Sequence, residues 1–206
     1  MIMLVDYGMG NLRSVEKALQ KVGLEVNRSS NPEDIDKADA IVVPGVGAFA
    51  DAIHNLERFG LKDKIIQAIN QGKPYLGICL GLQILFEYGY EFGEHEGLGI
   101  IKGKVIRFDE RLNIKIPHMG WNQVWIKKKD KMFKNIKEGD YFYFVHSYYA
   151  VPDEEDVIAS YTDYGVDFCS AIEKDNIWAV QFHPEKSQTT GLKFLQNFAD
   201  FVKNEI

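Results

Sequence analysis

The chain has 206 residues, of which 46% are hydrophobic, and 24 Lys and Arg against 30 Asp and Glu give a formal net charge of −6. This is the composition of a globular protein of one or two domains, and its negative charge disfavours nucleic acid or an anionic membrane as the main partner. The sequence has no apolar run long enough to span a membrane, and its start, MIMLVD, lacks the basic region of a signal peptide.

The first half of the sequence alternates short apolar runs with segments of helical periodicity. The expected strands are 2–5, 24–27, 40–43 and 75–78, and the expected helices are 12–22, 49–71 and 80–88. This alternation predicts a mostly parallel sheet flanked by helices, in an α/β fold.

The second half changes character, because Gly, Asp and Pro separate a series of short apolar segments. The strand-like segments are 99–108, 121–127, 141–146, 156–162, 168–173 and 177–182. A final helix is expected over about 187–204. We therefore expect an added antiparallel portion in the second half, closed by a C-terminal helix.

The two cysteines, Cys79 and Cys169, cannot build a disulfide framework and lack the spacing of a zinc site. A reduced, cytoplasmic protein without a metal is the simplest interpretation. Cys169 lies in a strand-like stretch and is expected to pack in the core.

Cys79, in contrast, lies in the segment YLGICLGLQ (residues 75–83), between two glycines, after an expected strand and before an expected helix. Gly-x-Cys-x-Gly at such a sharp turn is the pattern of a nucleophile elbow, with Cys in place of Ser. A helix N-terminus favours the thiolate, and the N–H of Leu80 is placed to stabilise an oxyanion. The alternative is a buried structural cysteine between two packing glycines.

His183 follows the apolar run WAVQF (residues 178–182) and is followed by Pro184 and Glu185. Residues two apart in extended backbone face the same side, and the proline biases His183 toward that conformation. Glu185 can then orient one imidazole nitrogen while the other faces the sulfur of Cys79. The sequence thus predicts a Cys–His–Glu triad, with a surface histidine before a turn proline as the alternative.

A second loop, VPGVGAF (residues 43–49), follows an expected strand of the same sheet and so ends at the same edge as Cys79. Its glycines, Gly45 and Gly47, allow backbone N–H groups to approach a substrate closely. We expect this loop to complete the oxyanion hole and to cradle a carboxylate, with a bare turn as the alternative.

Together these motifs resemble those of class I glutamine amidotransferases, with GICLGLQ (77–83) similar to the nucleophile motif and HPE (183–185) similar to the His–Glu pair. Within that family the chain is similar to the glutaminase subunits of imidazole glycerol phosphate synthase, in the segments DYGMGN (6–11), PGVGAF (44–49), PHMGWN (117–122), FVHSY (144–148) and HPEKS (183–187). The resemblance runs collinearly to about residue 204. It implies a flavodoxin-like fold and a single glutamine amidotransferase type 1 domain over residues 1–206.

The resemblance further implies that L-glutamine is hydrolysed to glutamate and ammonia through a glutamyl thioester on Cys79, without a cofactor. The catalytic residues would be Cys79, His183 and Glu185, and the oxyanion hole would use Leu80, Val46 and Gly47. The residues implied to contact the glutamine are Gly45, Gln83, Glu91, Ser147 and Tyr148. Glu91 lies in no sharp motif, and an exposed acid is its alternative interpretation.

Ammonia released into water would be protonated and lost as a nucleophile, so a partner is implied. By resemblance the partner is a (β/α)₈-barrel cyclase subunit, which uses the ammonia to form imidazole glycerol phosphate and aminoimidazole carboxamide ribotide in histidine biosynthesis. The implied partner-facing residues of this heterodimer are Asn11, Trp121, Asn122, Tyr143 and Lys186. Alternatively, Trp121 and Tyr143 pack in the core and Lys186 is solvated.

Other functions fit parts of the same sequence. A paralogous glutaminase subunit that feeds ammonia to a surface-sugar amidation pathway stays open, as does a stand-alone cysteine hydrolase. The Gly8-x-Gly10 pair suggests a dinucleotide site, but Arg13 occupies the position of the small third residue. A non-catalytic regulatory subunit is disfavoured by the intact Cys79, His183 and Glu185.

Overall fold

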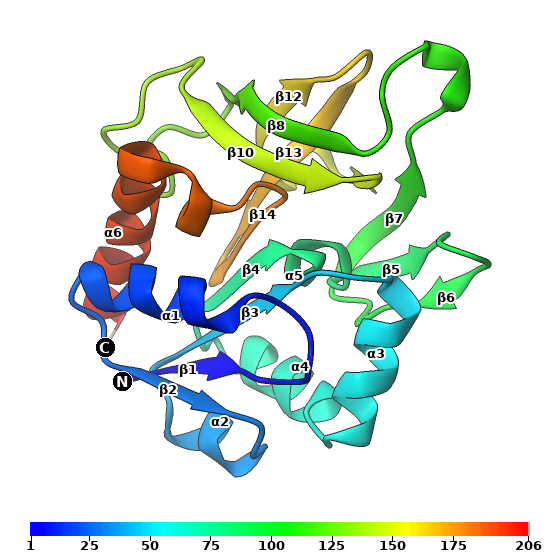
Figure 1. Ribbon diagram of the computed structural model, residues 1–206. Coiled ribbons are helices and arrows are strands. Elements are labelled where there is room, and N and C mark those ends of the chain that lie inside the picture. Colours follow the sequence, from blue (N-terminus) through cyan, green and yellow to red (C-terminus); the bar gives the residue numbers. More distant parts are fainter. Residues whose placement is uncertain (206) are drawn as a thin grey trace.

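The first half of the chain forms four parallel strands in the order β2-β1-β3-β4 in the computed structural model, which describes residues 1–205 (Figure 1). These strands are β1 (Ile2–Val5), β2 (Val26–Ser29), β3 (Ala40–Gly45) and β4 (Tyr75–Cys79). The helices that follow or connect them are α1 (Leu12–Lys21), α2 (Glu33–Lys37), α3 (Phe49–Arg58), α4 (Lys62–Asn70) and α5 (Leu80–Gln83). The chain ends in α6 (Gln188–Glu205).

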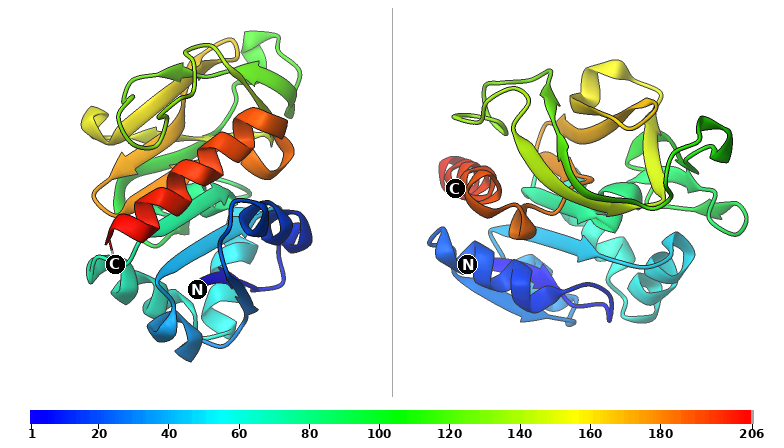
Figure 2. Two further views of the ribbon diagram at one scale, coloured as in Figure 1. Left: turned by 90° about the vertical axis from the view of Figure 1, so that its left-hand side faces the viewer. Right: turned by 45° about the horizontal axis from the view of Figure 1, so that its top comes forward.

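Helices cover both faces of this sheet, because alternate residues of each buried strand point to opposite sides. On one face, Leu4, Val42 and Ile78 belong to a core that includes α1 and α6, which lie side by side in Figure 2. On the other face, Val5 and Val43 belong to a second core, which includes apolar residues of α2, α3 and α4. No helix within residues 1–205 has the length and apolar character needed to cross a membrane.

The second half of the chain extends the same sheet. Its elements are β5 (Phe86–Gly89), β6 (His95–Glu96), β7 (Ile101–Arg107), β8 (His118–Gln123), β9 (Trp125–Ile126), β10 (Tyr141–His146), β11 (Tyr148–Pro152), β12 (Ile158–Asp163), β13 (Asp167–Lys174) and β14 (Ile177–Val180), with short 3₁₀ turns at Glu110–Leu112, Glu155–Val157 and Pro184–Lys186. The last strand, β14, lies parallel to β4 and antiparallel to β13. The expected fold class, a mostly parallel sheet flanked by helices with an added antiparallel portion, is confirmed.

A separate antiparallel pair, β8 and β10, lies at the top of Figure 1. The 3₁₀ turn that follows β14 contacts β10, so this pair adjoins the edge of the sheet at which β4 and β14 end. The pair therefore forms one side of the molecule next to that edge.

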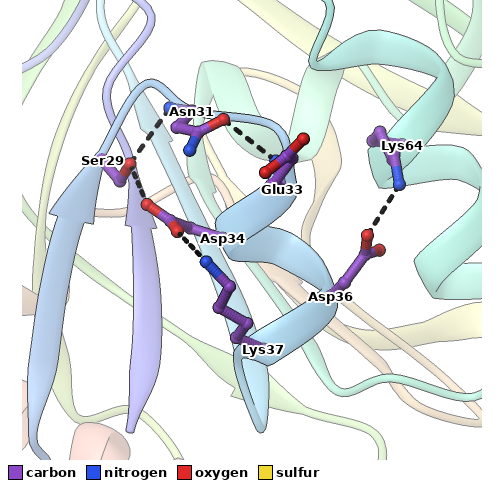
Figure 3. A network of polar contacts seen from close by, with 7 residues as sticks. All are labelled: Ser29, Asn31, Glu33, Asp34, Asp36, Lys37 and Lys64. Carbon is purple, nitrogen blue, oxygen red and sulfur yellow. Dashed lines mark hydrogen bonds and ion pairs between the residues drawn. The ribbon is translucent and has the colours of Figure 1, made fainter.

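Polar contacts hold the short helix α2 between the end of β2 and α4 (Figure 3). Ser29 Oγ donates to Asp34 Oδ2 at 2.6 Å, and the backbone N–H of Asn31 donates to Ser29 Oγ at 3.0 Å. Lys64 of α4 pairs with Asp36 at 2.7 Å. The helix α2 was not expected from the sequence, because its single buried apolar side chain gives no periodicity.

Two expected helices differ from those of the structure. The helix expected over 49–71 is broken at Gly60, whose positive φ of 67° ends α3 before α4 begins. The helix expected over 80–88 is wrong beyond its first turn, because residues 86–89 form β5, which pairs in parallel with β7. Side chains from Leu82 to Phe86 are all buried, so this run shows no amphipathic face that would have marked its end.

Candidate active site

Cys79 occupies a strained turn between β4 and α5. Its φ of 56° and ψ of −106° are rare for a residue with a side chain. The flanking glycines permit the turn: a Cβ at Gly77 would lie 2.4 Å from the Gly81 carbonyl oxygen, and a Cβ at Gly81 would lie 1.8 Å from that of Val43. The structure therefore has the geometry of the elbow that the sequence suggested.

The helix after Cys79 is shorter than expected, since α5 has four residues. A single turn aligns few peptide dipoles, so the expected helix-dipole stabilisation of the thiolate is correspondingly small. Instead, a side-chain amide contacts the sulfur, because Gln181 Nε2 lies 3.5 Å from Cys79 Sγ. Gln181 was not among the predicted site residues, although it is the one polar residue in the apolar run before His183.

His183 and Glu185 form a buried pair. His183 Nδ1 lies 2.8 Å from Glu185 Oε1, and their side chains are 3% and 2% exposed. As expected, His183 has extended backbone, with φ −103° and ψ 94°, whereas Glu185 lies in the 3₁₀ turn that Pro184 begins. Ser187, which the sequence analysis did not single out, fixes the turn because its Oγ donates to the His183 carbonyl at 2.6 Å.

The second nitrogen of His183, Nε2, has no hydrogen-bond partner of good geometry among residues 1–205. Burial opposes the charged imidazolium, but the side chains of Cys79 and Glu185 outweigh it and raise the pKa of His183 to about 10. A proton therefore resides on His183 at neutral pH, beside the sulfur.

The other cysteine has no comparable surroundings. Cys169 is buried in β13, where its Sγ lies 3.4 Å from the Ala171 carbonyl oxygen. Burial raises the pKa of its thiol to about 12, so it stays protonated. This environment fits the packing role expected for Cys169.

A cavity of about 410 Å³ opens at Cys79 and brings together most of the predicted site residues. It is lined by Val46, Gly47, Ala48, Cys79, Leu80, Gln83, Glu91, Val145, His146, Ser147 and Tyr148. Gly45 is not among these lining residues, because it is buried between the Tyr7 hydroxyl and Leu80. The other lining residues, Ala48, Val145 and His146, were not among the predicted site residues.

Two residues predicted to contact the substrate, Glu91 and Gln83, are held in place by hydrogen bonds within the protein. Glu91 Oε2 accepts a hydrogen bond of 2.9 Å from the N–H of Phe49, the first residue of α3. Gln83 Nε2 donates to the Tyr148 carbonyl at 3.0 Å and to Gln181 Oε1 at 3.0 Å. These contacts fix a carboxylate and an amide at the cavity, in positions that the sequence alone did not define.

A chain of hydrogen bonds also reaches the Tyr148 carbonyl from β8. His146 Nδ1 donates to that carbonyl at 2.8 Å, which leaves His146 Nε2 to accept from His118 Nδ1 at 2.9 Å. His118 Nε2 then accepts from Asn122 Nδ2 at 3.1 Å. Burial lowers the pKa of His118 to about 4 and that of His146 to about 3, so both rings are neutral at neutral pH.

Four of the five residues expected to face a partner lie on or next to β8 and β10. Trp121 pairs with Tyr143 across these strands, and Lys186 Nζ lies 5.7 Å above the Tyr143 ring. Trp121 is 46% exposed, so the alternative that it packs in the core is wrong. Asn122 contacts His118 and the Asp163 carbonyl. Asn11 is exposed at the start of α1, in another part of the chain.

Comparisons with known proteins agree with this fold and site. The model of the family "Glutamine amidotransferase class-I" matches residues 3–201. The chain is 58% identical over 196 residues to imidazole glycerol phosphate synthase subunit HisH of Aquifex aeolicus, covering 95% of this chain and 94% of that one. It is 51% identical over 203 residues to HisH of Geobacter metallireducens, covering 96% and 97% of the two chains.

Solved structures share the fold at low sequence identity. A crystal structure of glutamine amidotransferase matches with a TM-score of 0.74 at 19% identity, covering 96% of this chain and 98% of that chain. PurLQS from Thermotoga maritima matches with a TM-score of 0.73 at 18% identity, covering 99% and 97%. The chain belongs to the class I glutamine amidotransferases and, within them, to the HisH subunits of imidazole glycerol phosphate synthase.

Proposed function

We propose that this chain is the glutaminase subunit of imidazole glycerol phosphate synthase, which hydrolyses L-glutamine at Cys79 and supplies ammonia for histidine biosynthesis. The observation that carries the proposal is the strained Cys79 elbow in the lining of a cavity, beside the buried His183–Glu185 pair. We further propose that residues 1–206 form a single glutamine amidotransferase type 1 domain, which the continuous sheet supports.

In the first step, His183 Nε2 holds the proton removed from Cys79, and the sulfur attacks the side-chain amide carbon of glutamine. A C–S bond forms, and the carbonyl oxygen becomes an oxyanion. The N–H of Leu80 and an N–H of the loop at Val46 and Gly47 stabilise this oxyanion. The raised pKa of His183 supports this assignment, because the imidazolium keeps its proton until the leaving group needs it.

In the second step, the C–N bond breaks, and His183 transfers its proton to the leaving amine, which departs as ammonia. His183 then acts as a base toward a water molecule that attacks the glutamyl thioester. The C–S bond breaks, glutamate is released, and the proton taken from the water stays on His183, beside the Cys79 thiolate. Glu185 keeps Nε2 directed toward the sulfur throughout, because its carboxylate binds Nδ1.

The glutamine head group would be held by the residues opposite Cys79 in the cavity. Glu91 offers a carboxylate to the substrate ammonium group, and Gln83 together with the backbone of Ser147 and Tyr148 offers hydrogen bonds. Gly45 does not line the cavity, and its proposed role is to let the loop lie close to Leu80, because it has no side chain.

The partner is proposed to be a (β/α)₈-barrel cyclase subunit, bound on the side formed by β8 and β10. Exposed apolar side chains gather there, since Met119 is 61%, Trp121 46% and Tyr141 53% exposed. Asn11, Asn122, Tyr143 and Lys186 are proposed to complete this interface. Cys79 and Cys169 are both free thiols, which supports a cytoplasmic location for the complex.

The proposal is tested by the reaction of the complex with two nitrogen sources. Cys79→Ala should abolish glutamine-dependent synthesis and leave ammonia-dependent synthesis unchanged, because only the first needs the thioester. Glutamine hydrolysis by the alanine variant at the wild-type rate would overturn the mechanism. The mass of a mixture of this chain and the cyclase in solution tests the heterodimer, which would be wrong if the two do not associate at micromolar concentration.

A further inference from the structure

The loop 44–47 rests on the segment that follows β1. A Cβ added at Gly47 would lie 2.6 Å from Met9 Cε, and one added at Gly10 would lie 3.5 Å from the Cα of Gly45. The hydroxyl of Tyr7 donates to the Pro44 carbonyl at 2.8 Å. Three residues of the segment 7–10, namely Tyr7, Met9 and Gly10, thus lie against this loop.

The Tyr7 hydroxyl gives the Pro44 carbonyl a hydrogen-bond donor where the backbone pairing of β1 with β3 has ended. β1 pairs with β3 only as far as Leu4 opposite Val42, so the Pro44 carbonyl lies beyond the last backbone partner that β1 provides. A buried carbonyl without a hydrogen bond is costly, and Tyr7, which is fully buried, provides the donor. Burial, followed by the charge of Cys79, raises the pKa of Tyr7, so its hydroxyl keeps its proton.

This bond also sets the direction of the next N–H group. The peptide between Pro44 and Gly45 is planar, so the Gly45 N–H points away from the carbonyl that Tyr7 binds. The opposite side is that of β4, where Gly45 is paired with Cys79. A Cβ at Gly45 would lie 2.3 Å from the Tyr7 hydroxyl oxygen and 2.9 Å from Leu80 Cβ. Gly45 is thereby wedged between Tyr7 and the residue that follows the nucleophile.

We propose that Tyr7 is a positioning residue for the oxyanion-stabilising loop: its hydroxyl fixes the peptide between Pro44 and Gly45 and so holds the N–H groups of residues 45–47 in place relative to Cys79. The inference rests on the proposed glutaminase function. It adds a buried residue, outside the triad and the cavity lining, on which stabilisation of the oxyanion depends.

The test uses Tyr7→Phe in the complex with the synthase partner. Phe keeps the buried ring but leaves the Pro44 carbonyl without its donor. We expect kcat for glutamine hydrolysis to fall by about threefold to tenfold, the effect of one hydrogen bond, with a smaller change in KM. The rate at which iodoacetamide alkylates Cys79 should not change, because this displacement forms no oxyanion. A variant that only destabilised the site around Cys79 would change that rate, so the measurement separates the two effects.

Tyr164→Phe provides the matched control, since its hydroxyl also donates to a backbone carbonyl, that of Lys115, at 2.7 Å. This variant should keep the wild-type kcat. Met9→Ala is a second test, which keeps the Tyr7 bond and removes the methyl group that lies next to Gly47. It should lower kcat while the alkylation rate stays constant.

Three results would overturn the inference. An unchanged kcat in Tyr7→Phe would show that the Tyr7 hydroxyl does not position the loop, whatever the result for Met9→Ala, while the glutaminase function would stand. An alkylation rate that falls in parallel with kcat would place the effect on the nucleophile instead. If the wild-type complex does not hydrolyse glutamine, the proposed function fails, and the inference fails with it.

Discussion

His183 Nδ1 lies 2.8 Å from Glu185 Oε1, and both side chains are almost completely buried. The other carboxylate oxygen, Oε2, has no hydrogen-bond partner among residues 1–205, so the carboxylate acts mainly on the imidazole. This pairing holds the ring with Nε2 toward Cys79 and favours its protonated form. The His183–Glu185 pair therefore favours the Cys79 thiolate as a nucleophile and holds the proton that the leaving group will need.

Glu185→Gln should lower kcat for glutamine hydrolysis by roughly 10²- to 10⁴-fold, because a neutral amide no longer stabilises the imidazolium. The loss of the negative charge also lowers the pKa of His183, so the basic limb of the pH–rate profile should move to lower pH. Steady-state kinetics of the complex across pH measure both effects. Glu173→Gln, at a half-buried carboxylate in β13 away from the cavity, is the control and should leave kcat unchanged. A wild-type kcat in Glu185→Gln would contradict the assignment of the triad.

Gly81→Ala should destabilise the fold by more than about 3 kcal/mol, since its Cβ would lie 1.8 Å from a backbone oxygen that cannot move freely. Gly23→Ala serves as the comparison, because its φ is +79° but no atom lies within 4 Å of the added Cβ. Backbone strain alone should cost that variant about 1 kcal/mol. Urea denaturation of both variants measures the difference, and equal losses would refute the close packing of α5 on β3.

Trp121→Ala should weaken the complex with the synthase partner by about 2 kcal/mol, roughly thirtyfold in Kd, as expected for a central aromatic contact. Trp125 offers a matched control, because both indoles are 46% exposed and only Trp121 belongs to the proposed interface. Titration calorimetry with the partner gives both dissociation constants. The location of the interface is wrong if Trp125→Ala weakens binding as much as Trp121→Ala does.

The hydrogen bonds that run from His118 through His146 to the Tyr148 carbonyl should make the stability of the fold sensitive to acid. The folded-state pKa of His118 is about 4, below its ordinary value of 6.5, so the unfolded chain takes up the proton first as the pH falls. Stability is therefore present near neutral pH and lost as the pH falls from about 6.5 to 4.

His118→Gln removes the titrating group, so its stability should fall less between pH 7 and pH 5 than that of the wild type. Urea midpoints at the two pH values measure the difference. His54→Gln, at an exposed position, should retain the wild-type acid dependence. If His118→Gln and the wild type lost equal stability between pH 7 and pH 5, the role of the His118–His146 pair would be disproved.

The parallel core could be predicted from the sequence because its signals are local. The apolar runs at 2–5 and 40–43 are buried strands, and the Gly-x-Cys-x-Gly pattern forms the turn that only flanking glycines allow. The His183–Glu185 contact was also predicted, since it spans two residues around a proline. In each case the residues that determine the geometry are neighbours in the chain.

What the sequence could not show depends on pairing between distant segments. β14 pairs with β4 in parallel, with Ile177 opposite Tyr75, and this pairing brings Gln181 to the sulfur of Cys79. In the sequence Gln181 is only the one polar residue of an apolar run, and its contact with the sulfur depends on the tertiary fold. The wrong helix at 80–88 has the same origin, since the pairing of Phe86 with β7 overrides the apolar run.

The central claim, covalent catalysis at Cys79, is tested most directly by acid-quenching the complex during glutamine turnover and mapping modified peptides by mass spectrometry. We predict one added glutamyl group on the peptide that contains Cys79, lost on treatment with hydroxylamine and absent from Cys79→Ala. A glutamyl group on the peptide that contains Cys169, or glutamine turnover that persists in Cys79→Ala, would contradict the account.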